Sequence, residues 1–292
     1  MKKKSDEPVF DLVVNAISIL IVLVVAYPLV YVISASFSSP LSILQGEIWL
    51  WPVHPSLESY GYIIGDARIW TGYGNTLLYT SVGTAVNLTL TILAAYPLSR
   101  RDLPGRNFFM LLMVFTMYFS GGIIPTYLVV KQLGLLNRFW VMILPTAIST
   151  YNLIVARTYF QASIPNELLE SGRIDGAGNF RLLLTIVLPL SSPIIAVIGL
   201  FYAVDHWNAF FNALIYLRDA AKYPLQLILR DILLRSVVDD VGADALGMKE
   251  QLLISEGIKY AVILVSTLPV MLLYPWIQKY FVKGVMIGAI KG

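Results

Sequence analysis

The sequence predicts an all-α, polytopic membrane protein with about six transmembrane helices. Of its 292 residues, 57% are hydrophobic and only 13% are charged, whereas a soluble domain carries about 25% charged residues. The mean hydropathy is +0.72. The charges leave six uncharged stretches, at residues 12–46, 69–99, 107–130, 139–156, 182–204 and 260–278. Each is at or near the roughly 20 residues that a tilted helix needs to cross a bilayer.

Each stretch is expected to be helical, because a backbone amide inside the bilayer must be paired within its own segment. A membrane β-barrel would show short alternating segments, and these stretches are continuous instead. We place the spans at about 10–34, 75–99, 107–130, 138–158, 184–216 and 257–279. Gly121, Gly122 and Pro125 predict a kink in the third span. The fifth is too long for one straight crossing, and Pro189 and Pro193 predict a bend near its start.

The first stretch also raises the question of a secretory signal. Lys2, Lys3 and Lys4 precede it, and residues 34–36 form a small-x-small triplet. Its apolar core is far longer than the roughly 7–15 residues of a signal peptide. We therefore expect a first helix that is retained.

Orientation follows from Lys and Arg, which collect on the cytoplasmic side of membrane proteins. If both termini are cytoplasmic, each of the four inner segments holds three: Lys2, Lys3 and Lys4; Arg100, Arg101 and Arg106; Arg157, Arg173 and Arg181; Lys279, Lys283 and Lys291. The outer segment 218–259 holds six, but it is long and also carries seven acidic residues. Long loops count little in this rule. We therefore expect both termini inside.

Two outer segments are expected to be structured. Residues 35–74 contain tryptophans and tyrosines suited to the membrane interface, and residues 222–236 have the pattern of an amphipathic surface helix. Simple anchoring and a binding role both fit these patterns.

Several kinds of chemistry have no basis in the sequence. It has no cysteine, which excludes disulfides, thiol nucleophiles and thiolate metal sites. The two histidines, His54 and His206, fall in an outer loop and in the fifth span, so no metal site is expected. No G-x-x-x-x-G-K-[ST] loop is present to hold nucleotide phosphates. With a net charge of +3 and no basic cluster among aromatics, nucleic-acid binding is not expected. Catalytic residues are not expected either.

Residues 163–193 are unusual for a loop between two membrane spans. Ser163 and Pro165 predict the start of a helix, in the preferred order of cap and then early proline. The pair Asp175-Gly176 predicts its end, and a second helix is expected to begin near Asn179. Small residues flanked by charges fit a docking surface for another protein. They fit an amphipathic helix resting on lipid head groups equally well.

The fifth predicted span carries the ionisable residues Asp205 and His206, and such groups inside a membrane usually face a cavity. Since a helix turns about 100° per residue, one face should hold Tyr202, Asp205, Asn208, Asn212 and Tyr216, with Trp207 nearly opposite. Hydroxyl, amide and aromatic side chains suit a sugar. The predicted substrate pathway is therefore Tyr202, Asp205, Asn208 and Asn212, together with Tyr151 and Asn152 of the fourth span. Alternatively, Asp205 bonds a neighbouring helix or lies at the outer interface.

The loop at 163–193 resembles the cytoplasmic loop of the membrane subunits of ATP-binding-cassette (ABC) importers. That signature is E-A-A, three residues, G, nine residues and I-x-L-P. The matching residues are Glu170, Ser171, Gly172 and Gly176, then Ile186, Leu188 and Pro189. Serine and glycine replace the two alanines, which keeps both positions small but weakens the helix. Residues 119–137 and 278–292 resemble the carbohydrate branch. They are most similar to the subgroup related to the smaller membrane subunit of the maltose importer, which serves oligosaccharides and, in some members, uronic-acid oligomers.

The resemblance implies a type I ABC importer permease architecture. Residues 1–292 would form a single transmembrane permease domain, with a core at about 70–286 and a cytoplasmic coupling helix at about 163–178. The implied ATPase-coupling residues are Glu167, Glu170, Ser171, Gly172, Asp175 and Gly176. The implied partners are a second homologous permease subunit, two ATPase subunits, an extracellular or periplasmic sugar-binding protein and membrane lipid. ATP and Mg would be bound by the ATPases, and no cofactor by this chain.

The expected function is therefore that of a non-catalytic transmembrane subunit of an ATP-driven sugar importer, with an oligosaccharide as the expected cargo. The expected location is the bacterial cytoplasmic (inner) membrane. An ATP-independent secondary transporter or channel is the alternative, but it would need internal repeats or several buried charges. An intramembrane enzyme would need paired acid–base groups, and only Asp205 with His206 is available. The identity and charge of the sugar do not follow.

Overall fold

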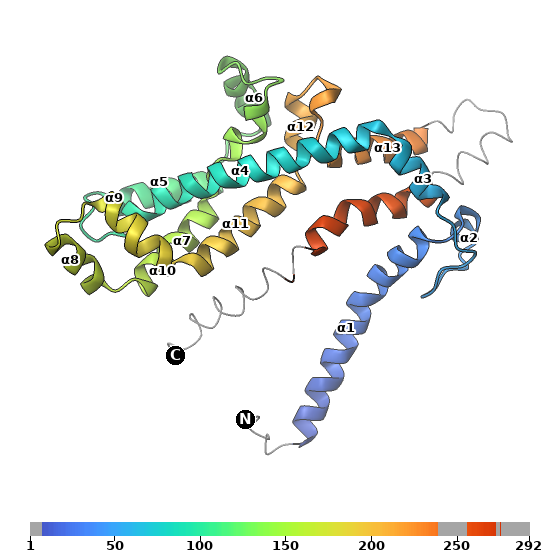
Figure 1. The fold of residues 1–292 in the computed structure, drawn as a ribbon, viewed down its shortest axis with the longest axis horizontal. Helices are drawn as coiled ribbons and strands as arrows, with labels where there is room; N and C mark the ends of the chain where they lie inside the picture. Colours follow the sequence, from blue (N-terminus) through green and yellow to red (C-terminus); the bar gives the residue numbers. More distant parts are fainter. Residues whose placement is uncertain (1–7, 239–255, 273–274, 276–292) are drawn as a thin grey trace. The chain divides into compact units, whose positions relative to one another are not determined.

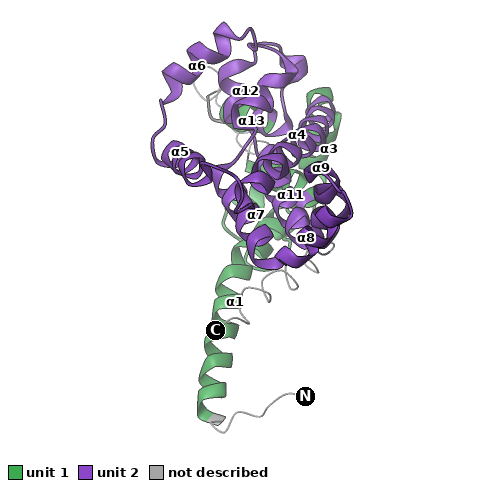
Figure 2. Cartoon of the chain, turned by 90° about the vertical axis from the view of Figure 1, so that its left-hand side faces the viewer, with its two compact units in different colours: residues 1–69, 229–269 green, residues 70–228, 270–292 purple. Residues whose placement is uncertain are grey.

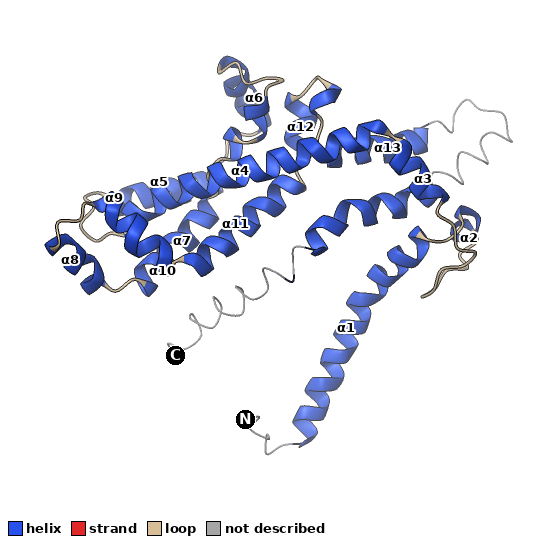
Figure 3. Cartoon of the chain, in the orientation of Figure 1, coloured by secondary structure: helices blue, strands red, loops and turns tan. Residues whose placement is uncertain are grey.

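The computed structural model describes residues 8–238, 256–272 and 275, and every regular element in this part is a helix (Figures 1 and 3). The only strand-like contact there is an isolated bridge between Ser38 and Pro55. The chain divides into two compact units, residues 1–69 with 229–269 and residues 70–228 with 270–292 (Figure 2). Each unit is described separately below.

The first unit is built around one long apolar helix. Its elements are α1 (Pro8–Ser36), α2 (Pro40–Leu44), α3 (Glu58–Gly65) and a helical segment at 256–269. The α1 window that is apolar enough to span a membrane is 0% buried by the chain. A small core of Ala35, Ile43 and Ile48 lies at the C-terminal end of α1, and Tyr31 packs edge-on against Tyr260. Because so little of α1 is covered, its apolar surface suits lipid or another apolar surface.

The second unit contains most of the remaining helices. In chain order they are α4 (Ala67–Ser99), α5 (Arg106–Tyr118), α6 (Ile123–Gln132), η1 (Phe139–Met142), η2 (Leu144–Thr146), α7 (Thr150–Ser163), α8 (Asn166–Ile174), α9 (Asn179–Leu182), the π-helical η3 (Leu183–Val187), α10 (Leu188–Leu190), α11 (Ser192–Trp207), α12 (Phe211–Tyr216), η4 (Ala220–Lys222) and α13 (Leu225–Val238). The first residues of α4 and the last ten of α13 fall in the ranges of the first unit.

In the described residues, α1 and α4 are long and apolar enough to cross a membrane as single helices, and three bent pairs raise the possible number of spans to five. The predicted third span breaks between α5 and α6 with a bend of 115°. Gly122 at this break has φ +83°, a conformation that glycine adopts readily. The predicted glycine kink is therefore a sharp reversal. Of the predicted sixth span, residues 257–272 are helical and 275 is described, while 273–274 and 276–279 lie outside the described residues.

The predicted fifth span differs most from the structure. It bends by 85° between Leu190 and Ser192, close to the two prolines, as expected. It does not continue to 216: α11 ends at Trp207, Asn208 follows as its C-cap, and α12 begins at Phe211. The side chain of Asn208 donates to the Val204 carbonyl at 3.0 Å. An asparagine that bonds its own backbone favours a helix end, so the assumption of one continuous face from 202 to 216 is wrong.

Two buried cores lie at different heights along α4. One contains Tyr79 with residues of α6, η1, α12 and α13. The other contains Ala95 and Tyr96 of α4, Leu153 of α7, Leu169 of α8, and residues of α9, η3 and α11. Since Tyr79 and Ala95 are 16 residues apart, the two cores are centred about 24 Å apart along the helix. The α8 segment belongs to the second core.

Candidate functional site

Helix α8 forms the loop that the sequence singles out. Pro165 takes the N-cap position and the helix starts at Asn166, while Ser163 still belongs to α7. Ser163 therefore does not cap α8, and the predicted order of cap and proline is wrong. The predicted end is confirmed: α8 stops at Ile174, Gly176 has φ +78°, and α9 begins at Asn179. The Ala177 amide donates to the Gly172 carbonyl at 2.9 Å and closes the helix end.

The two faces of α8 differ sharply. Leu169 and Gly172 are buried against the chain. The exposed residues of the opposite side follow a spacing of i, i+3, i+4 and i+7, which places them on one face: Glu167, Glu170, Ser171 and Ile174. Ile174 is 87% exposed. A short helix that shows two carboxylates, a small residue and an uncovered isoleucine has a surface suited to another protein.

The predicted coupling glycines have different roles. A Cβ at Gly172 would lie 2.5 Å from Leu182 Cδ2 and 3.2 Å from Ile186 Cδ1, so this glycine allows α8 to pack on its own chain. The interpretation of Gly172 as part of an outward-facing small surface is therefore wrong. Gly176 has open space around it, and its positive φ alone would strain any other residue. Asp175 is exposed beside it as the C-cap.

An ion pair fixes α8 to the loop that follows α4. The Arg173 guanidinium donates to Asp102 Oδ2 at 2.5 Å, and Arg100 Nε lies 3.3 Å from Asp102 Oδ1. The hydrogen bond from Arg173 is the main reason that the pKa of the Asp102 carboxyl falls to about 2. Asp102 is therefore ionised throughout the physiological range. Asp102 is a residue that sequence reasoning missed, since it lies 71 positions from its partner.

Most of the predicted pathway residues line two cavities. One, of about 420 Å³, is lined by Tyr202, Asp205 and His206 of α11 and Asn212 of α12, together with Asn87, Met142, Pro145, Thr146, Ile148, Ser149 and Ala209. The other, of about 480 Å³, is lined by Tyr151 and Asn152 of α7 and by Ser149, Leu200, Phe201, Val204 and Asp205. Asp205 and Ser149 border both. Asn208 lines neither, and Tyr216 is buried and stacks on Tyr127 with ring centroids 6.1 Å apart.

A polar ladder between α4 and α11 includes three residues that line the first cavity, Asn87, Tyr202 and His206. Asn87 Nδ2 lies 3.1 Å from His206 Nε2, and one turn along, Thr91 Oγ1 lies 2.6 Å from the Tyr202 hydroxyl. The Ser149 amide also donates to that hydroxyl at 3.0 Å. His206 is thus held by a helix-to-helix hydrogen bond, and in the described residues no group of three His, Asp or Glu side chains could hold a metal ion.

Asn87 also offers the cavity a free acceptor. It is buried, and its Oδ1 is among the buried side-chain oxygens with no hydrogen-bond partner in the described structure. A buried polar atom without a partner is costly, and a hydroxyl-bearing ligand would satisfy it. Sequence reasoning missed Asn87. The available signal was the spacing of Thr80, Thr84, Asn87 and Thr91 on one face of an apolar helix.

Comparisons with known proteins are consistent along almost the whole chain. A family model described as "Binding-protein-dependent transport system inner membrane component" matches residues 87–287. The chain is 45% identical over 285 residues to the polygalacturonan/rhamnogalacturonan transport system permease protein YtcP of Bacillus subtilis (strain 168), covering 97% of this chain and 98% of that protein. It is 26% identical to the arabinooligosaccharides transport system permease protein AraQ of Halalkalibacterium halodurans, covering 100% of both.

A solved structure shares the fold. A chain of the crystal structure of a bacterial ABC transporter involved in the import of the acidic polysaccharide alginate aligns with a TM-score of 0.83 at 33% sequence identity. The alignment covers 96% of this chain and 99% of that one.

Proposed function

This chain belongs to the family of binding-protein-dependent transport system inner membrane components, and from this premise we propose that it is one permease subunit of an ATP-driven oligosaccharide importer. It would form half of the translocation pathway, with a second homologous permease subunit as the other half. Relatives named for polygalacturonan/rhamnogalacturonan and for arabinooligosaccharides support the substrate class. An extracellular or periplasmic sugar-binding protein would deliver the cargo.

The observation that carries the proposal is the exposed face of α8. Glu170, Ser171, Gly172 and Gly176 occupy the signature positions of the ABC importer loop. The first three lie in α8, which leaves one face uncovered while the other packs into the chain. We assign the uncovered face, made up of Glu167, Glu170, Ser171 and Ile174, and the adjoining Asp175 to docking on a cytoplasmic ATPase subunit. ATP and Mg would be held by the two ATPases, and this chain would bind no cofactor and catalyse no reaction.

Substitutions confined to the exposed face of α8 test the docking assignment. Glu170→Lys reverses a charge and Ile174→Asp removes an uncovered apolar side chain, and neither residue is buried in the chain. Both variants should insert normally but lose co-purifying ATPase and sugar-stimulated ATP hydrolysis. Glu58→Lys, the same charge reversal on the exposed surface of α3, is the matched control and should keep both. Transport that continues without any ATPase partner would favour the alternative of a secondary transporter or channel.

We assign the sugar pathway to the two cavities beside α11. Tyr151, Asn152, Tyr202, Asp205 and Asn212 line them, and the assigned pathway also includes Asn208, which is exposed just past the end of α11. Amide and hydroxyl groups beside aromatic rings suit sugar hydroxyls and the apolar face of a pyranose. The orphaned Asn87 Oδ1 adds an acceptor to the first cavity.

Leucine substitutions test this pathway. Losing a hydrogen-bond partner for a buried polar group costs about 1–3 kcal/mol, so Asn212→Leu should lower uptake at limiting sugar roughly five- to a hundredfold. Asn208→Leu should change uptake least, because its amide is bonded to Val204 of its own helix. ATPase docking should survive in both variants. A larger effect of Asn208→Leu than of Asn212→Leu would place the main sugar contacts outside the two cavities.

The charge at Asp205 tests what kind of sugar is carried. If the cargo is acidic, like the alginate of the structural relative, the Asp205 carboxylate would repel it, and Asp205→Asn should raise uptake. With a neutral sugar the same change should leave uptake unchanged or lower it. Uptake of labelled neutral and uronic-acid oligosaccharides by both proteins distinguishes the two.

A further inference from the structure

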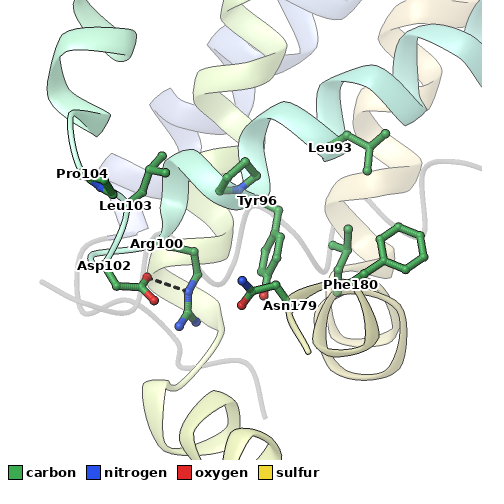
Figure 4. Close-up of a pocket in the computed structure, with 10 residues that line it drawn as sticks. Leu93, Tyr96, Arg100, Asp102, Leu103, Pro104, Asn179 and Phe180 are labelled. Atoms are coloured by element: carbon green, nitrogen blue, oxygen red, sulfur yellow. Dashed lines mark hydrogen bonds and ion pairs between the residues drawn. The ribbon is translucent and has the colours of Figure 1, made fainter. Parts of the chain in front are cut away.

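A third pocket, of about 390 Å³, lies at the end of α4 and plays no part in the pathway above (Figure 4). Its walls come from the last turns of α4, the loop after it, and the start of α9 and η3. The lining residues are Leu93, Tyr96, Pro97, Arg100, Asp102, Leu103, Pro104, Asn179, Phe180 and Leu183.

The polarity of this pocket changes along α4. Leu93 is six residues before the end of α4 at Ser99, which puts it about 9 Å further into the span. Leu93 is 45% exposed, so the deeper wall is apolar and uncovered, and Phe180, which is 66% exposed, adds a second apolar side chain beside Asn179. Arg100, Asp102 and Asn179 provide the polar groups of the pocket. An apolar wall inside the span and charges at its end match the order of groups in a phospholipid.

Tyr96 supplies an unused donor in the pocket. The residue is only 6% exposed, yet its hydroxyl has no hydrogen-bond partner in the described structure. In Figure 4 its ring points toward the side chain of Asn179, with Arg100 on the same side of the helix. A buried hydroxyl without a partner is costly. An acceptor on a bound ligand would satisfy it.

The charges around this hydroxyl favour an anion. The Arg100 side chain is 14% exposed, and its Nε is the donor that faces Asp102 at 3.3 Å. Asp102 would repel an anion, but it also accepts a hydrogen bond from Arg173 at 2.5 Å. Two guanidinium groups and one carboxylate leave a net positive charge. A guanidinium has five N–H donors, so Arg100 can serve both Asp102 and a ligand.

We propose that this pocket binds the phosphate head group of a membrane phospholipid, with the Tyr96 hydroxyl and the Arg100 guanidinium as donors to the phosphate. The upper part of an acyl chain would lie against Leu93 and Phe180. The proposal requires that α4 spans the bilayer, and so rests on the proposed function to that extent. A free anion would leave the apolar wall uncovered.

The test uses two lining variants and one matched control. The full-length chain, in its complex purified from host membranes, is delipidated and titrated with phosphatidylglycerol, and bound lipid is counted by native mass spectrometry. Tyr96→Phe removes one atom that has no hydrogen-bond partner among the described residues, and Arg100→Gln removes one positive charge. Arg101→Gln removes the same charge one residue later, at a side chain that does not line this pocket.

Each donor to a charged phosphate should be worth roughly tenfold in affinity. We therefore expect phosphatidylglycerol retention to fall roughly tenfold in Tyr96→Phe and in Arg100→Gln and to stay unchanged in Arg101→Gln. Thermal unfolding of all three variants shows whether each still folds. Equal retention in all four proteins overturns the proposal, as does equal loss in Arg100→Gln and Arg101→Gln, which would mean a diffuse charge effect.

Competition separates lipid from the other possible occupants. Diacylglycerol, which lacks the phosphate, and inorganic phosphate, which lacks the chains, should each displace phosphatidylglycerol at least tenfold less well than unlabelled phosphatidylglycerol does. Displacement by inorganic phosphate alone at equal concentration means a free-anion site and overturns the proposal. Loss of ATPase association in Tyr96→Phe with unchanged lipid retention means a protein contact and overturns it as well.

Discussion

At the scale of single residues, Gly83 determines how closely α4 and α11 approach. A Cβ at Gly83 would overlap the His206 ring, whose Nε2 lies 3.1 Å from the Asn87 amide. The small residue and the polar pair therefore form one contact, in which the missing side chain makes room for a helix-to-helix hydrogen bond. Small residues that allow close approach are typical of helix contacts in membranes.

Gly83→Ala should lower stability by about 1–3 kcal/mol, because the added methyl group overpacks this contact. Gly74→Ala is the matched control, since Gly74 lies in the same helix with open space around it. Thermal unfolding of the detergent-solubilised protein measures both. In a His206→Ala background the cost of Gly83→Ala should shrink, because the ring that it meets is gone. A cost that is the same in both backgrounds would show that His206 is not the neighbour that matters.

The sequence predicted some of the site residues and missed others for an identifiable reason. Asp205 was found because an ionisable side chain in an apolar stretch is conspicuous, and Tyr202 and Asn212 were found because they share its predicted helical face. Asn87 and Ser149 were missed because their partners on α11 are 119 and 53 residues away. Pairings over such distances depend on which helices pack together, and a single sequence does not give this.

At the scale of elements, two interactions hold α8 in place: the packing of one of its faces and an ion pair. Gly172 seats the helix on Leu182, and Arg173 ties it to Asp102 after α4. The packed face fixes the position of the helix, and the ion pair adds a second contact to the loop after α4. The sequence predicted the end of α8 through its turn pair, but not its start, because Ser163 was already part of the preceding helix.

The Asp102–Arg173 pair gives a pH prediction. The pKa of Asp102 is about 2 in the folded chain, below the unperturbed value of about 3.9. A carboxyl with a depressed pKa contributes stability above the unfolded value, and loses it as pH falls through the folded one. The stability difference between the wild type and Asp102→Asn should therefore be constant from about pH 8 to pH 5, and shrink only below about pH 4.

The contribution of the Asp102–Arg173 pair to stability should be modest. Both side chains are about half exposed, so the pair is worth about 0.2–1 kcal/mol and should weaken in high salt. Asp175→Asn, which removes an exposed carboxylate at the end of the same helix, should change unfolding less. A difference that grows as pH falls from 7 to 5 would contradict the low pKa.

Helix boundaries show where sequence reasoning works and where it does not. Five of the six uncharged stretches fall on helices or bent helix pairs that are long and apolar enough to cross a membrane, because a long apolar run suits a helix in lipid. Breaks inside the predicted spans were harder to predict. The third predicted span reverses at Gly122, and the helix of the fifth ends at Trp207. These breaks depend on local backbone geometry and on side-chain bonds such as that of Asn208, which hydropathy does not report.

At the scale of the whole molecule, the predicted resemblance to ABC importer permeases is confirmed by the family match and by the fold of the alginate importer. The same buried core contains Leu169 of α8, Leu182 of α9, Val187 of η3, and Ile198 and Tyr202 of α11. Tyr202 lines the first cavity. A movement of α8 on an ATPase would therefore act on a continuous packed path that reaches the cavity wall, and packed interiors transmit displacement because they are dense.

Orientation remains a prediction from the positive charges, and the chain is well suited to test it. It has no cysteine, so a single introduced thiol reports one position without background. Gly178 has open space around it and lies beside Asn179, after α8, while Arg218 is exposed after α12. Ser5 near the N-terminus and Asp239 in the outer segment 218–259 would also suit a thiol, but both lie outside the described residues.

With both termini cytoplasmic, Gly178→Cys should resist an impermeant maleimide in intact cells and react once the membrane is opened. Arg218→Cys should react in intact cells, because it follows the outer end of the fifth span. The physical reason is the count of three positive residues in each of the four inner segments, which the membrane potential and the insertion machinery hold inside. Reaction of Gly178→Cys from outside would reverse the topology. It would also remove α8 from the side where ATP is available, and with it the docking role.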